Sequence, residues 1–128
     1  MKRDMDLVRS MLLAIEASEP YADVMRMDID GLLPEDDEQN TEYLRRYYHA
    51  ELLVDAGFIK GDATVGEYLV QSITWQGYEF LDAVRDPEIW KKTKAGVKSV
   101  GTASVAIIWE IAKGYAKQAA QTKLGLPL

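Results

Sequence analysis

The sequence predicts an α+β fold, in which a small domain of helices and short strands is followed by a helical extension. Three observations indicate this class. Apolar residues recur at helical spacing near the N-terminus, a short stretch after them alternates apolar with polar residues, and a long apolar-rich segment lies near the C-terminus. A chain of 128 residues has room for one domain and an added segment. We place the domain at residues 1–86 and the C-terminal helices, for packing or dimerisation, at 87–128.

The N-terminal part predicts a helix and then a strand. Asp4 or Asp6 is expected to cap the helix, because a carboxylate accepts hydrogen bonds from its first backbone amides. One apolar stripe follows at the spacing i, i+3, i+4, i+7, formed by Val8, Met11, Leu12 and Ile15. Pro20 ends the helix because it cannot continue the hydrogen-bond ladder. In residues 25–30 apolar and charged residues alternate, which predicts a half-buried strand closed by Gly31.

A second helix is predicted over residues 41–56, with Gly57 as a left-handed stop. The next residues indicate a β-hairpin. It consists of a first strand at FIK, a tip rich in Gly and Asp at 61–67, and a returning strand at YLVQSIT. Helix, strand, helix and hairpin in this order are typical of a winged helix, a helix-turn-helix variant whose second helix enters the DNA major groove. The polar segment before the second helix is too short for the usual intermediate helix, so we expect at most one turn at 34–38.

Further helices are predicted after the hairpin. Thr74 caps the first, Asp86 and Pro87 cap and begin the second, and the last runs over roughly 102–123. Gly96 and Gly101 are expected to loosen the connection to the last helix. Aromatic and aliphatic side chains recur here at helical spacing, which favours a core over a stacking platform for bases. The expected core residues are Trp75, Tyr78, Phe80, Leu81 and Trp90.

Two sets of residues resemble known families. YHAELLVDAGFI, at 48–59, is similar to the recognition helix and following strand of winged-helix regulators. A narrower set consists of MKRDMDLVR at the start, the pair Tyr48-His49, and ITWQGYEFLDAVRDPEIWKKTK at 73–94. Together these resemble a family of small bacterial and prophage-associated proteins catalogued as a domain of unknown function. The resemblance covers nearly the whole chain, and it implies a winged-helix-like fold and a bacterial or prophage context but no catalytic residue.

Composition excludes several classes of protein. Cysteine is absent, which excludes disulfides, thiolate metal sites and thiol nucleophiles. With one histidine, no Gly-rich phosphate loop and no nucleophile elbow, we expect no enzyme and no cofactor. The acidic residues at 28–38 lack the ligand spacing of a calcium loop, so no metal site is expected. The N-terminus has no signal-peptide core, and no run approaches the roughly 20 apolar residues of a membrane span, which predicts a cytoplasmic protein with no membrane partner.

Charge is unevenly distributed along the chain. Residues 1–90 hold 8 of the 15 basic and 20 of the 21 acidic side chains, whereas 91–128 hold seven lysines and one glutamate. The net charge of −6 argues against non-specific coating of nucleic acid but leaves room for a small local contact. The basic segment is either a contact for phosphate or anionic lipid, or a solvated lysine face docking on a neighbouring subunit. The second interpretation is favoured.

The second predicted helix carries the candidate recognition surface for double-stranded DNA. Projected as a helix, its cationic side chains gather opposite a broad apolar side that includes Leu44. Arginine can fork onto guanine or phosphate, and histidine can donate to phosphate. The helix therefore predicts a DNA-binding protein, and the family resemblance implies a prophage-associated setting, in which we expect a transcriptional regulator. The expected contacts are Arg45, Arg46, Tyr48, His49 and Lys60.

The alternative function is a winged-helix module that binds another protein and not DNA. The same helix face can be a solvated one on which Glu42 pairs with an arginine. The hairpin tip has more acidic than basic residues, and a fold of this kind serves both functions.

The last predicted helix carries a candidate dimer interface. Apolar residues recur at alternating intervals of three and four positions, as in the seam of a coiled coil, and further apolar residues lie outside this seam. One face can pack on its own domain while another meets a second chain, so homodimerisation is expected and would suit a pseudo-palindromic DNA site. The alternatives are full burial within one chain or a helix on a membrane surface. The expected interface residues are Val105, Ile108, Trp109, Ala112 and Tyr115.

Overall fold

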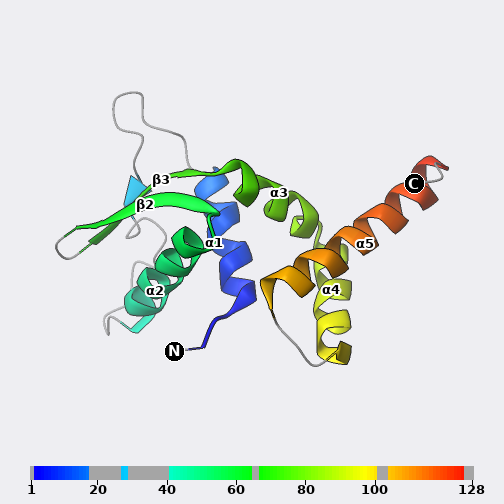
Figure 1. Cartoon of the computed structure of the whole chain (residues 1–128), viewed down its shortest axis with the longest axis horizontal. Coiled ribbons are helices and arrows are strands. Elements are labelled where there is room, and N and C mark those ends of the chain that lie inside the picture. Colours follow the sequence, from blue (N-terminus) through cyan, green and yellow to red (C-terminus); the bar gives the residue numbers. More distant parts are fainter. Residues whose placement is uncertain (1, 18–26, 29–40, 65–66, 101–103, 126–128) are drawn as a thin grey trace. The chain divides into compact units, whose positions relative to one another are not determined.

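The structure, a computed structural model, describes residues 2–17, 27–28, 41–64, 67–100 and 104–125 (Figure 1). The chain divides into two compact units, Met1–Tyr78 and Glu79–Leu128, so the division falls before the predicted boundary at residue 86. The predicted α+β class is confirmed, because helices accompany an antiparallel sheet. Within the described ranges, none of the helices has the length and apolar character needed to cross a bilayer.

The first unit combines helices with a small sheet. Its elements are α1 (Met5–Ala17), β1 (Met27–Asp28), α2 (Thr41–Asp55), β2 (Ile59–Thr64), β3 (Glu67–Ile73) and the start of α3 (Trp75–Val84). The strands are antiparallel in the order β1-β3-β2, with Met27 opposite Val70 and a register shift between Lys60 and Gly61. Both α1 and α2 contact the hairpin of β2 and β3 (Figure 1). The turn predicted at 34–38 and most of the acidic cluster at 28–38 lie outside the described residues.

The core of the first unit contains the apolar stripe that the sequence predicts on α1. All four predicted stripe residues are buried, and Met11 and Leu12 are fully enclosed. Each such aliphatic side chain contributes about 1.5–3 kcal/mol through removal from water. α1 also buries Leu7, and further buried side chains come from α2, the hairpin and the turn between them, including Leu53, Phe58 and Val70.

Gly57 ends α2 as predicted, with a left-handed φ of +75°. Its N–H donates to the Val54 carbonyl, and the Phe58 N–H donates to the Leu53 carbonyl, both at 2.9 Å. These two bonds form a Schellman motif, which satisfies carbonyls at the end of the helix. The chain therefore reverses directly into β2, and Phe58 just before this strand and Ile59 at its start are both buried.

The second unit contains the rest of α3, followed by α4 (Pro87–Val100) and α5 (Val105–Leu124). Asp86 caps α4, because its carboxylate accepts from the amides of Glu88 and Ile89 at 2.8 and 3.1 Å. Ser104 caps α5 by accepting from the Ile107 amide at 3.3 Å. α4 and α5 pack against each other.

Gly96 lies inside α4, so the expectation that it loosens the connection to the last helix is wrong, and Gly101 lies outside the described residues. A Cβ atom at this position would lie 3.2 Å from Cγ2 of Ile111 and 3.5 Å from the hydroxyl of Tyr115. The glycine therefore permits the close approach of α4 and α5 at this point. Propensity alone suggests a break at glycine, but helix packing decides the conformation here.

Candidate interaction surface

His49 is fully buried, so the prediction that it lies on the exposed side of α2 is wrong. The backbone N–H of Asp4 donates to Nε2 of the ring at 2.9 Å, and Nδ1 lies 2.7 Å from the carbonyl oxygen of Arg45. Because a backbone amide can only donate, Nε2 is the acceptor, and Nδ1 carries the hydrogen that is donated to Arg45. The imidazole is thus a neutral link between α2 and the residues that begin α1. A projection of one helix could not show that another segment covers this side.

Arg45 is also committed to the beginning of α1. Its Nη2 donates to Oδ2 of Asp4 in an ion pair whose side chains are 34% and 38% exposed. The other carboxylate oxygen of Asp4 accepts from the amides of Asp6 and Leu7 at 2.9 and 3.3 Å, so Asp4 caps α1 as predicted. Solvent screening limits the contribution of such a half-exposed pair to less than about 1 kcal/mol. Its geometric effect is to direct one of the two arginines inward toward α1.

The other predicted DNA contacts are not gathered on one face. Arg46 is half-buried, and its Nε atom is enclosed. Tyr48 is 36% exposed, and its ring meets His49 edge-on with centroids 5.8 Å apart. Lys60 is exposed on β2. Of the five residues, Tyr48 and Lys60 are exposed, Arg45 and Arg46 are half-buried, and His49 is enclosed.

The exposed stripe of α2 is apolar at one end and acidic at the other. Leu44, predicted to lie on the packed side, is 57% exposed, and Tyr48 follows one turn later. Glu51 and Asp55 continue the stripe toward the end of the helix, and both are exposed. None of these four side chains is cationic. Such a face is unsuited to a polyanion, because phosphate contacts require positive charge.

The first turn of α3 is held tightly against the junction of α2 and β2. The backbone N–H of Thr74 donates to the Phe58 carbonyl at 2.9 Å, and the Thr74 hydroxyl accepts from the Gly77 amide at 3.0 Å. The side-chain amide of Gln76 donates to the Ala56 carbonyl at 3.3 Å. Gly77 faces inward so closely that a Cβ atom there would lie 2.1 Å from the Phe58 carbonyl oxygen. These contacts fix which face of α3 points into the first unit.

The same contacts leave two aromatic residues on the outside of α3. Trp75 is 82% exposed and Tyr78 is 41% exposed, so the prediction that both belong to the core is wrong. Phe80, Leu81 and Trp90 are buried, as predicted. The signal available in the sequence was Gly77. A glycine in the first turn of a helix marks a close approach to another segment, and the residues beside the approaching face then point away from that segment.

The predicted dimer seam on α5 is partly occupied within the chain. Ile108 is 2% exposed and Ala112 is fully buried, so these two cannot present a surface to a second chain in this conformation. The Trp109 ring packs edge-on against Phe80 with centroids 5.7 Å apart. Val105 and Tyr115 are half-buried. The alternative of burial within one chain therefore describes Ile108 and Ala112 better than the dimer interface does.

Comparison with known proteins connects this chain to a family without an assigned activity. A family model described as "Hypothetical protein (DUF2513)" matches residues 2–104. A protein of Haemophilus influenzae, described as an uncharacterised protein, is 35% identical over 104 residues, which are 77% of this chain and 80% of that protein. No solved structure gives a significant match. The resemblance to a family of uncharacterised proteins is thereby confirmed.

Proposed function

This chain belongs to the family described as hypothetical protein DUF2513, and from its own surfaces we propose that it is a protein-interaction module built on a winged-helix-like fold. The order α1, β1, α2, β2, β3 and the sheet order β1-β3-β2 support this fold, with β2 and β3 as the wing. In such a domain α2 occupies the place of the reading helix. Folds of this kind host more than one function, so the function is argued from the exposed side chains.

The exposure of Trp75 carries the proposal. A tryptophan that is 82% exposed leaves a large apolar area in water, and tryptophan is enriched among the residues that dominate binding energy at protein interfaces. Its position is fixed, because Thr74, Gln76 and Gly77 on the same turn are all held by residues 56–58. A rigid aromatic side chain loses little conformational entropy when a partner covers it. Tyr78, one turn further along, extends the aromatic surface.

The charges around α2 and α3 favour a protein partner over DNA. Arg45 is paired with Asp4 and His49 is buried, which removes two of the contacts expected for a DNA recognition surface. The exposed acids Glu51, Asp55 and Glu79 lie on these same two helices. Exposed aromatic and acidic side chains on these helices suit a partner that offers apolar and basic side chains.

We expect replacement of Trp75 by alanine to abolish partner binding while leaving the fold intact. The chain carries a matched control in Leu124, another exposed apolar side chain at 66% exposure, on α5. The tagged protein, Trp75→Ala and Leu124→Ala are expressed in the cells that encode the chain, and the proteins recovered with each are quantified. A partner recovered with the unchanged protein and with Leu124→Ala should be depleted about tenfold or more with Trp75→Ala. When the partner is purified, its affinity for Leu124→Ala should match that for the unchanged protein, and its affinity for Trp75→Ala should be lower.

DNA binding is the second candidate, supported by the surface positions of Tyr48 on α2 and Lys60 on β2. As a prophage-associated regulator the chain would shift a duplex fragment from its own operon, with affinity that falls steeply as salt rises. Such a shift, reduced by Lys60→Ala and unaffected by Trp75→Ala, would replace the interaction module as the conclusion.

A further inference from the structure

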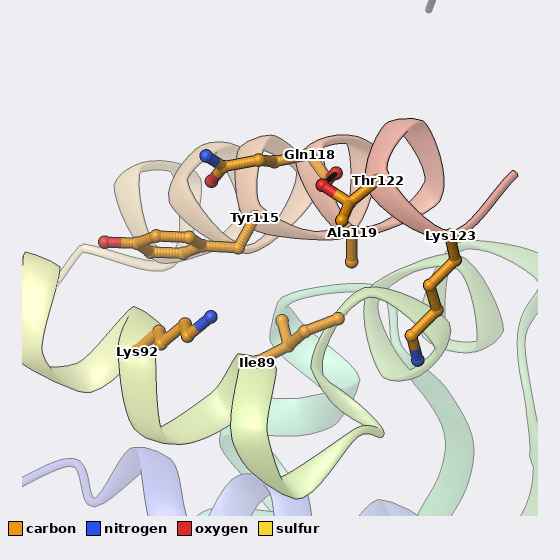
Figure 2. Close-up of a pocket in the computed structure, with 7 residues that line it drawn as sticks. All are labelled: Ile89, Lys92, Tyr115, Gln118, Ala119, Thr122 and Lys123. Carbon is orange, nitrogen blue, oxygen red and sulfur yellow. Dashed lines mark hydrogen bonds between the residues drawn. The ribbon is translucent and has the colours of Figure 1, made fainter. Parts of the chain in front are cut away.

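α4 and α5 enclose a shallow groove on the second unit, with a volume of about 320 Å³. Its apolar floor is formed by Ile89 of α4 and Ala119 of α5, which lie in the middle of the groove in Figure 2. The Tyr115 ring forms a wall toward one end. This volume is at the lower end of the range for binding pockets, and it suits one or two apolar side chains.

Two lysines lie at opposite ends of this floor. Figure 2 shows Lys92 from α4 on the Tyr115 side and Lys123 from α5 at the other end. Among the side chains that the structure describes, neither lysine has a carboxylate partner. Lys113, in contrast, pairs with Glu110 at 2.8 Å and lies over the Trp109 ring. The groove therefore combines an apolar floor with two ammonium groups available for an anionic ligand.

The separation of the lysines indicates an extended ligand. The α5 residues that line the groove run from Tyr115 to Lys123, which corresponds to about 12 Å along a helix. A compact anion such as phosphate would meet one lysine and leave the apolar floor uncovered. A peptide segment with an aliphatic side chain between two acidic residues matches the apolar floor and the lysine at each end of it.

We propose that this groove binds an acidic segment of a partner protein. The segment places an aliphatic side chain between Ile89 and Ala119, and a carboxylate against each of Lys92 and Lys123. The surrounding charge favours such a ligand, because α4 and α5 together hold seven lysines and only two acids, Glu88 and Glu110. Charge complementarity of this kind accelerates encounter and selects among partners. The inference does not rest on the Trp75 surface, which belongs to the other unit.

The test uses the full chain and a fluorescein-labelled helical peptide of Ala, Glu and Leu. Its two glutamates are about seven residues apart, one on each side of a central leucine, to match the spacing of the lysines. The readout is fluorescence polarisation at low salt. The double variant Lys92→Glu/Lys123→Glu should weaken the peptide affinity about tenfold or more, and Ala119→Leu, which fills the floor without changing charge, should weaken it as well.

The matched control is Lys91→Glu/Lys117→Glu. Both of these lysines are exposed on the same two helices, do not line the groove, and change the net charge equally. This control should keep the peptide affinity within about twofold. Equal losses in the two double variants, or equal affinity for a peptide with lysines in place of the glutamates, would overturn the proposal. The proposal would also be overturned if the chain bound duplex DNA more tightly than the peptide and both double variants weakened that DNA binding equally. Such a result indicates a general contact for polyanions. Trp75→Ala should retain peptide binding, which separates this inference from the proposed function.

Discussion

A single imidazole joins the beginning of α1 to α2. His49 accepts a hydrogen bond from the Asp4 amide through one ring nitrogen and donates to the Arg45 carbonyl through the other, and it has no exposed surface. Asp4 adds an ion pair with Arg45 and caps α1. Removal of one partner from a buried hydrogen bond costs the desolvation of the group left behind. His49 and Asp4 therefore both contribute to stability, and neither is free to act as a ligand contact.

Replacement of His49 by alanine should destabilise the protein by about 2–4 kcal/mol, because it leaves the Asp4 amide unsatisfied and creates a cavity. Urea unfolding followed by circular dichroism measures the free energy of unfolding. Tyr48→Ala is the neighbouring control and should cost less than about 1 kcal/mol, since Tyr48 is partly exposed. A stability loss at His49 no larger than that at Tyr48 would contradict the buried link.

The two functions of Asp4 can be separated by substitution. Asp4→Asn keeps a side-chain oxygen for the helix cap and removes the charge, so its cost should remain below about 1 kcal/mol. Asp4→Ala removes the cap as well and should cost about 1–2 kcal/mol. The comparison is again made by urea unfolding, and equal costs for both variants would show that capping contributes little at this site.

At the scale of elements, the first turn of α3 decides which surface the first unit presents. Gly77 faces inward against the Phe58 backbone, and Trp75 consequently faces outward. Gly96 has the corresponding function on α4, where it lies against Ile111 of α5. Each glycine allows a helix to approach its neighbour more closely than any side chain would permit.

Gly77→Ala should destabilise the protein by at least about 2 kcal/mol, because the added methyl group would lie 2.1 Å from a backbone oxygen and α3 would have to move. Gly114→Ala is the matched control: it is also a helical glycine, on α5, and nothing lies within 4 Å of the added atom. That change should be neutral or stabilising by up to about 1 kcal/mol, because alanine has the higher helix propensity. Thermal unfolding distinguishes the two, and a neutral Gly77→Ala would argue against the docked first turn.

At the scale of the whole molecule, the described surface offers little for a symmetric pairing of α5 helices. Ile108 and Ala112, at the centre of the predicted seam, are enclosed within the chain. The large apolar side chains that are exposed on α5 are Ile107 and Leu124, which lie at opposite ends of the helix. A stable dimer generally requires a contiguous apolar core at its interface.

We therefore expect the chain to be monomeric at micromolar concentration. Sedimentation equilibrium should give a mass close to 14.4 kDa. A mass near twice this value, reduced to that of one chain by Ile107→Glu, would restore the homodimer predicted from the sequence. The substitution acts on an exposed residue, so the folded state should be retained.

Local patterns determined much of the architecture. The stripe on α1, the left-handed stop at Gly57, the hairpin and the Asp86 cap follow from residue spacing and backbone stereochemistry, which act over a few neighbouring residues. Packing between distant segments decided the surface. Helical projection of α2 could not show that the Asp4 segment covers His49, and aromatic spacing on α3 could not show that Gly77 turns Trp75 outward. Side-chain exposure depends on which segment lies opposite, so only the tertiary structure assigned the histidine to the interior and the tryptophan to the exposed surface.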